Sequence, residues 1–113
     1  MIAITGANGF IGNHLYQYLL KKGIKARRIT RNGEDDSFAI GNISGETNWY
    51  KALKNIQVII HCASVTHIDN QKSSSMEELK EVNIKATRNM VEQASKKGVK
   101  RIIFISSIKV NGE

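Results

Sequence analysis

Apolar residues gather along the chain in runs that predict five short β-strands. These runs span residues 1–5, 25–30, 38–40, 58–63 and 101–105. The last two are nearly continuous apolar runs, which are typical of central strands in a parallel sheet that is covered on both faces.

Two segments between these strands have the spacing of amphipathic helices. The first is followed by Gly23, which predicts its end. Its spaced residues are Phe10, Ile11, His14, Leu15, Tyr18 and Leu19. The second starts at a capping box of Ser75 and Glu78 and stops at Gly98. Its apolar face comprises Leu79, Val82, Ala86, Met90, Val91 and Ala94.

The order of these elements predicts the fold class. A third, shorter helix is expected over Thr47–Leu53, with Leu53 and either Trp49 or Tyr50 turned inward. Strands that alternate with helices predict an α/β fold with a doubly wound parallel sheet, in three layers α/β/α. A length of 113 residues fits one small domain.

Composition excludes several classes of protein. Hydrophobic residues make up 41% and charged residues 24% of the chain, as in an ordinary globular domain. No run approaches the roughly 20 apolar residues of a membrane helix, and no basic segment precedes the first strand, so we expect neither a membrane partner nor export. The single cysteine, Cys62, excludes an internal disulfide framework and predicts a cytoplasmic protein.

The positive charge does not by itself indicate a nucleic-acid partner, which stays a minority alternative. Seventeen Lys and Arg against ten acidic residues give a net charge of +7, but the cations are scattered in pairs. Lys21-Lys22 and Lys96-Lys97 fall at the ends of the predicted helices, where cations stabilise the helix dipole. No basic stripe with interleaved aromatic residues is present, so we expect no nucleic acid and an anionic small ligand instead.

A glycine-rich loop lies between the first strand and the first helix. Gly6, Gly9 and Gly12 form a G-x-x-G-x-x-G pattern in this position. Such a loop turns tightly, brings backbone amides close to a pyrophosphate and packs the helix against the strand. Its place between a strand and an amphipathic helix predicts a dinucleotide-binding site.

Four segments together resemble the extended short-chain dehydrogenase/reductases, within the NAD-dependent epimerase/dehydratase family of the UDP-glucose 4-epimerase type. They are the glycine loop at 6–12, the strand at 58–63, Asn83-Ile84-Lys85-Ala86-Thr87, and the stretch Phe104–Glu113 with Ser-Ser-Ile-Lys-Val-Asn-Gly-Glu. The resemblance implies a Rossmann-like sheet. It covers the whole chain, and implies that residues 1–113 are the N-terminal part of an NAD(P)-binding domain.

The resemblance also implies which residues bind the cofactor. Asn42 and Ile43 would contact the adenine, with Asn42 standing where the family usually has an acid, and Thr66 would lie near the nicotinamide and the sugar. The full set for the cofactor is Gly6, Asn8, Gly9, Phe10, Ile11, Gly12, Arg31, Asn42, Ile43, Cys62, Ala63, Ser64, Asn83 and Ser106. Thr66 and Ser107 would bind substrate.

Ser107 is the expected catalytic residue, because in the resembled family the second serine of this pair hydrogen-bonds the reacting sugar oxygen. It works there beside a Tyr-x-x-x-Lys acid/base pair that follows the serine. All three tyrosines of this chain precede Ser107. Tyr18 with Lys22 and Tyr50 with Lys54 match the spacing by chance, so the catalytic pair and the substrate-binding C-terminal part are expected to be absent and the 113 residues inactive alone.

The resemblance implies NAD as the cofactor, whereas one local residue leaves NADP open. NAD-preferring members carry an acid at the end of the second strand, and this chain has Arg31 there, which suits a 2′-phosphate or stacks on adenine. The implied activity is a nucleotide-sugar 4-epimerase acting on a UDP-hexose or UDP-N-acetylhexosamine. The alternatives are an NAD(P)H-dependent UDP-4-keto-6-deoxy-sugar reductase or dehydratase, and a dinucleotide-binding module without turnover.

The remaining polar and reactive residues are expected to have structural roles, and for Asn83 such a role stands beside the cofactor contact that the resemblance implies. Asn83 and Thr87 fall on the apolar face of the long helix, so both need hydrogen-bond partners. The histidines have no spacing that suggests a metal site, and Cys62 is expected to pack as a small apolar residue. The strand over 101–105 is expected to lie at a sheet edge with one uncovered face, which favours a homo-oligomer.

Overall fold

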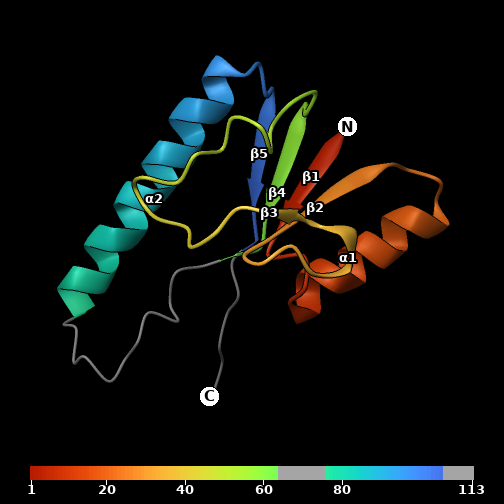
Figure 1. The fold of residues 1–113 in the computed structure, drawn as a ribbon, viewed down its shortest axis with the longest axis horizontal. Helices are drawn as coiled ribbons and strands as arrows, with labels where there is room; N and C mark the ends of the chain where they lie inside the picture. Colours follow the sequence, from red (N-terminus) through yellow and green to blue (C-terminus); the bar gives the residue numbers. More distant parts are fainter. Residues whose placement is uncertain (64–75, 106–113) are drawn as a thin grey trace.

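The computed structural model describes residues 1–63 and 76–105, and Figure 1 shows their arrangement. Strands and helices follow one another as β1 (Ile2–Thr5), α1 (Phe10–Lys21), β2 (Ala26–Thr30), the 3₁₀ turn η1 (Glu34–Asp36), β3 (Phe38–Ala39), β4 (Val58–His61), α2 (Met76–Lys96) and β5 (Arg101–Phe104). The five predicted strands are confirmed, each within two residues of its expected bounds.

The strands form one parallel sheet in the order β3-β2-β1-β4-β5. The chain therefore moves outward from β1 in one direction first and then in the other, which is the doubly wound arrangement. Each pairing is parallel, and β1 lies in the centre with Ile2 beside Ala26 on one side and Val58 on the other. The predicted Rossmann-like α/β fold is confirmed.

Each face of the sheet has its own cluster of buried side chains. Side chains alternate along β1, so that Ala3 faces the cluster with α2 while Ile4 faces the cluster with α1. On the α1 side, Leu19 is buried against Ile4 and Ala7. Figure 1 shows α1 and α2 on opposite sides of the sheet, as the three-layer prediction requires.

The predicted helix over Thr47–Leu53 is wrong. Residues 50–55 form turns, with one helical hydrogen bond from the Leu53 amide to the Trp49 carbonyl (3.0 Å). The Asn48 side chain accepts the Tyr50 amide (3.0 Å), which offers this backbone an alternative to the helix. A helix this short cannot overcome the cost of its own nucleation without further support.

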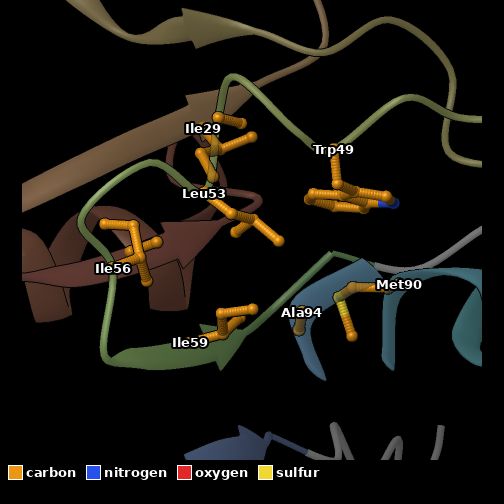
Figure 2. Close-up of a cluster of buried hydrophobic side chains, with 9 residues drawn as sticks. Ile29, Trp49, Leu53, Ile56, Ile59, Met90 and Ala94 are labelled. Atoms are coloured by element: carbon orange, nitrogen blue, oxygen red, sulfur yellow. The ribbon is translucent and has the colours of Figure 1, made fainter. Parts of the chain in front are cut away.

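Contacts with distant parts of the chain, and not helical hydrogen bonds, stabilise this irregular segment. Trp49 and Leu53 are fully buried, whereas Tyr50 is exposed, so Trp49 is the aromatic residue that turns inward. Figure 2 shows Trp49 beside Met90 and Ala94 of α2, in a cluster that also contains Ile59. The Trp49 indole N–H is buried without a hydrogen-bond partner in the part of the chain that the structure describes.

Arg27 of β2 secures the end of the same segment. Its guanidinium donates to the carbonyl oxygens of Ala52 (2.7 Å) and Lys54 (2.8 Å). These bonds satisfy carbonyl groups that a helix would have paired internally. The connection from β3 to β4 thus covers the α2 side of the sheet as irregular chain.

Most of the predicted apolar face of the long helix α2 is confirmed among its described side chains, and Leu79 is not one of these. Ala86, Met90 and Ala94 are buried, but Val91 is 39% exposed and lies beside the face rather than on it. Asn83 and Thr87 are half-buried. The two predicted helices end at Lys21 and Lys96, which confirms the position of their terminal lysines. Ser75 of the predicted capping box lies outside the described residues.

Strand β5 lies at one edge of the described sheet and pairs with β4. Ile103, Phe104 and Ile105 are all more than a third exposed, which confirms the expected uncovered apolar strand. Exposed apolar edges of this kind favour association with another chain. The homo-oligomer itself stays a prediction.

Candidate functional site

The site is built where β1 ends and α1 begins, at the carboxyl edge of the sheet (Figure 1). Gly6 follows the last residue of β1 with φ of 62°, a left-handed conformation that favours glycine. The Gly9 amide then donates to the Gly6 carbonyl (3.0 Å) and closes the turn. The chain enters α1 directly after Gly9, which is its N-cap.

Two of the three glycines are required by close backbone contacts. A Cβ atom on Gly6 would lie 2.8 Å from the Ala63 nitrogen, and one on Gly12 would lie 2.3 Å from the Gly6 carbonyl oxygen. Gly12 is buried, so its missing side chain lets α1 pack directly onto the turn. Gly9 is exposed together with Asn8 and Phe10. The loop therefore presents backbone outward at its second glycine.

The N-terminus of α1 is suited to an anion. No side chain caps it, and its first turn carries no acidic residue. Because the first helical bond runs from the Asn13 amide to the Gly9 carbonyl (2.9 Å), the amides of Phe10, Ile11 and Gly12 have no acceptor within the helix. Unpaired amides and the helix dipole together attract phosphate. These residues fit the pyrophosphate of a dinucleotide.

The end of β4 packs against this loop through the hydroxyl of Thr5. Thr5 is fully buried, and its Oγ1 accepts the amides of Cys62 (3.0 Å) and Ala63 (3.2 Å). The same oxygen lies 2.7 Å from Nδ1 of His61. Both lone pairs of the hydroxyl are engaged by amides, so its proton is donated to His61. Three groups at the end of β4 are thus fixed by one atom of β1.

His61 is held neutral by this arrangement. An Nδ1 that accepts the Thr5 proton is unprotonated, which places the ring proton on Nε2. Desolvation by burial lowers the pKa of His61 to about 4. The ring also packs edge-on against Phe104, with centroids 5.7 Å apart. His61 is therefore a structural acceptor, consistent with the prediction that it is held at a strand end.

Cys62 belongs to the apolar packing of the α1 side. It packs against the cluster of Ile4, Ala7 and Leu19, and burial raises the pKa of its thiol. A thiol with a raised pKa is a poor nucleophile. Among residues 1–63 and 76–105, no group of His, Cys, Asp and Glu side chains could hold a metal ion, and no helix is long and apolar enough to cross a membrane.

A second part of the site follows β2 and β3. Arg31 and Asn42 are both exposed, and the Arg31 guanidinium donates to Oδ1 of Asn42 (3.4 Å). Ile43 is half-buried against the core cluster. The Asn42 carbonyl accepts the hydroxyl of buried Thr47 (2.8 Å). Arg31, Asn42 and Ile43 thus lie close together after β2 and β3, and their predicted contact with adenine stays a prediction.

The structure brings the predicted residues together in two groups. One group is the glycine loop with Cys62 and Ala63, and the other is Arg31 with Asn42 and Ile43. Asn83 is half-buried on α2. Four predicted residues lie outside the described part of the chain: Ser64, Thr66, Ser106 and Ser107.

Sequence reasoning missed Thr5, and with it the role of His61. A signal was present, because Thr5 is a polar residue at the end of a buried strand, next to the first glycine. The tyrosines of the two chance Tyr-x-x-x-Lys matches lie at the surface: Tyr18 and Tyr50 are 57% and 44% exposed. The Tyr18 ring contacts Lys22 of its own match, whereas the Tyr50 ring contacts Lys97.

Comparison with known proteins places these features in a family. Residues 2–113 match the model of the NAD dependent epimerase/dehydratase family. The chain is 41% identical over 118 residues to UDP-glucose 4-epimerase of Vibrio cholerae, a match that covers 99% of this chain and 36% of that protein. It is 32% identical over 111 residues to the decarboxylating sterol-4-alpha-carboxylate 3-dehydrogenase of Bos taurus, covering 95% and 30%.

A solved structure gives the same result. MoeE5 in complex with UDP-glucose and NAD is 28% identical and superimposes with a TM-score of 0.71. The match covers 98% of this chain and 38% of MoeE5. The chain thus spans about a third of the length of the proteins that it matches.

Replacing Thr5 with Val tests the hydroxyl contact. The variant keeps the shape of the side chain but leaves two part-buried amides and the His61 acceptor unpaired, so we expect a loss of about 2–4 kcal/mol in the free energy of unfolding. Thr5→Ser keeps the hydroxyl and should retain most of that stability. Urea unfolding of both variants is the measurement, and equal losses would show that the hydroxyl is not the stabilising group.

The lowered pKa of His61 predicts a pH dependence of stability. The ring titrates near pH 6.5 in the unfolded chain and near 4 in the folded one, so only the unfolded state gains a proton between these values. Stability is full above pH 6.5 and falls as the pH drops towards 4, by up to about 3 kcal/mol from this group. Urea unfolding between pH 4.5 and 7.5 should show this slope, and His61→Gln should reduce it. An unchanged slope in the variant would contradict the assignment.

Proposed function

The chain belongs to the NAD dependent epimerase/dehydratase family, and we propose that it forms the NAD-binding N-terminal part of a nucleotide-sugar 4-epimerase. One observation carries the cofactor site: the glycine loop of residues 6–12 turns onto an uncapped helix N-terminus at the carboxyl edge of the sheet. Open α/β sheets bind dinucleotides at this edge.

In this proposal the two parts of the site bind different parts of NAD. The amides of Phe10, Ile11 and Gly12 hold the pyrophosphate, with Asn8 and Gly9 exposed beside it. Asn42 and Ile43 receive the adenine, and Arg31 lies at its edge. Cys62, Ala63, Ser64, Asn83 and Ser106 line the rest of the dinucleotide in this proposal. Bound NAD would supply the hydride acceptor and donor for the sugar carbon.

The chain's own polar groups serve the substrate. We assign to the Ser107 hydroxyl a hydrogen bond to the reacting C4 oxygen of the sugar, and to Thr66 a position beside the sugar. None of the three tyrosines follows Ser107. In a protein of its relatives' length, the acid/base pair Tyr-x-x-x-Lys and the part that binds the nucleotide sugar would follow these 113 residues.

The choice of reaction within the family rests on similarity. The 41% identity with a UDP-glucose 4-epimerase favours 4-epimerisation of a UDP-hexose or UDP-N-acetylhexosamine. Arg31, exposed at the end of β2, favours a second candidate because a guanidinium suits the 2′-phosphate of NADP. That candidate is an NADPH-dependent reductase of a UDP-4-keto-6-deoxy-sugar. We propose the cytoplasm as the location, in keeping with the single cysteine.

Gly12→Ala tests the cofactor site. Its methyl group would collide with the Gly6 carbonyl and displace α1 from the turn, so NAD affinity should fall at least tenfold, or about 1.4 kcal/mol. Gly23→Ala is the matched control, because it strains a positive φ in open space at the other end of α1. Calorimetric titration with NAD and NADP measures both variants, and equal affinity in Gly12→Ala and the native chain would refute this site.

Turnover is tested on the protein extended to the length of its relatives. Incubation with UDP-N-acetylglucosamine and no added cofactor should yield its 4-epimer, and Ser107→Ala should lower kcat by about 10²-fold or more. Strict dependence on added NADPH with a 4-keto substrate would favour the reductase. NAD binding without turnover of either substrate would favour the third alternative, a dinucleotide-binding module that catalyses no reaction.

A further inference from the structure

Two amide side chains of α2, Asn89 and Gln93, form a polar contact with the segment that follows Asn42. They lie one turn apart, are both half-buried, and are joined by a bond from Gln93 Nε2 to Asn89 Oδ1 (2.7 Å). Neither residue belongs to the glycine loop or to the predicted site. Their other partners all belong to the backbone of residues 44–49.

Every amide proton of this pair has an acceptor. Asn89 Nδ2 donates to the carbonyl oxygens of Ser44 (3.3 Å) and Thr47 (2.8 Å), and Gln93 Nε2 donates to the same Thr47 carbonyl (2.7 Å). Gln93 Oε1 accepts the amide of Trp49 (2.7 Å). Turning either side-chain amide over would set carbonyl oxygens against one another, so the orientation of both groups is determined by the segment.

Thr47 connects the amide pair to Asn42 through hydrogen bonds. Its carbonyl is held by α2, while its hydroxyl donates to the Asn42 carbonyl (2.8 Å) and accepts the Ser44 amide (2.7 Å). Thr47 is 7% exposed, so these bonds are shielded from competing water. The position of Asn42 is thus linked through one buried residue to Asn89 and Gln93.

Residues 44–46 belong to neither of the two apolar clusters. A groove of about 490 Å³ opens here between the segment and α2, with Lys85 and Arg88 on its helix side. Ser44, Gly45 and Glu46 form its other wall. The backbone comes close to α2 at Gly45, where a Cβ atom would lie 3.3 Å from that of Lys85. Ile43 and Trp49 anchor the two ends in the core, and the amide pair holds what lies between.

We propose that Asn89 and Gln93 are positioning residues for the adenine end of the cofactor site. This inference rests on the proposed function, which places adenine at Asn42 and Ile43. The amide pair holds residues 42–49 in the binding conformation before the cofactor arrives, so that binding does not have to order them. Removing its donors should weaken binding of the adenine half and leave the nicotinamide half unaffected.

Asn89→Asp is the sharpest variant, since it keeps the size of the side chain and replaces two donors with an acceptor that faces two carbonyls. We expect the Kd for AMP and for NAD to rise about tenfold, and the Kd for nicotinamide mononucleotide to stay within twofold. Glu92→Gln is the matched control, because it makes an equally small change at the exposed position that directly precedes Gln93 in α2. It should alter none of these Kd values. Gln93→Glu, which keeps the acceptor for Trp49 and loses the donor to Thr47, should give a smaller loss for AMP.

Amide hydrogen exchange provides a readout that does not depend on a ligand. In Asn89→Asp the Ser44 and Trp49 amides should exchange at least tenfold faster, while those of Ile4 and Ile59 in the sheet stay protected. Ile59→Val controls for a general loss of stability and should leave the Kd for AMP unchanged.

The outcomes separate the two proposals. Faster exchange at Ser44 and Trp49 with an unchanged Kd for AMP would overturn the positioning role while leaving the cofactor site intact. An equal loss for AMP and nicotinamide mononucleotide would also overturn it, because the effect would then be general. If the native chain binds neither AMP nor NAD, the proposed function itself fails.

Discussion

The hydroxyl of Thr5 is the contact on which the site depends. It is fully buried and joins the end of β1 to three groups at the end of β4: the amides of Cys62 and Ala63 and the ring of His61. Because Gly6 has no side chain, the backbone of Ala63 can approach the turn closely. The glycine loop therefore packs directly against the backbone of Cys62 and Ala63, and this contact sets the position at which α1 begins.

The other half of the site depends on a segment with no regular structure. Residues 40–57 connect β3 to β4 on the α2 side of the sheet, and side chains from elsewhere satisfy much of their backbone. Arg27 binds the carbonyls of Ala52 and Lys54, and Asn89 and Gln93 bind the backbone of residues 44–49. Trp49 anchors it in the core, although its indole N–H has no partner among the described residues. The segment at Asn42 and Ile43, where we propose that adenine binds, is thus held by side-chain hydrogen bonds, and the glycine loop by close backbone packing and the Thr5 hydroxyl.

These two modes of support have different consequences for the protein. A change at Gly12 acts on close backbone contacts, because a Cβ atom there would meet the backbone of Gly6 and Ala7, and a change at Thr5 acts on a buried hydroxyl that binds the amides of Cys62 and Ala63. A change at Asn89 acts on a segment that borders a groove and that α2 holds by side-chain hydrogen bonds. Stability and cofactor affinity should therefore be coupled at the glycine loop and separable at the α2 contact.

The sequence by itself determined the doubly wound α/β fold and the glycine loop between the first strand and the first helix. Apolar periodicity is a local property, and a glycine triplet between a strand and a helix has few other uses, so both could be recognised without contacts. The failed helix over Thr47–Leu53 shows the limit, because the local pattern could not reveal that Arg27, 20 residues or more away in sequence, would bind its carbonyls. Only the tertiary structure decided that Thr5 meets His61 and that Gln93 meets Trp49, since hydrogen bonds between residues more than 40 positions apart depend on how strands and helices pack.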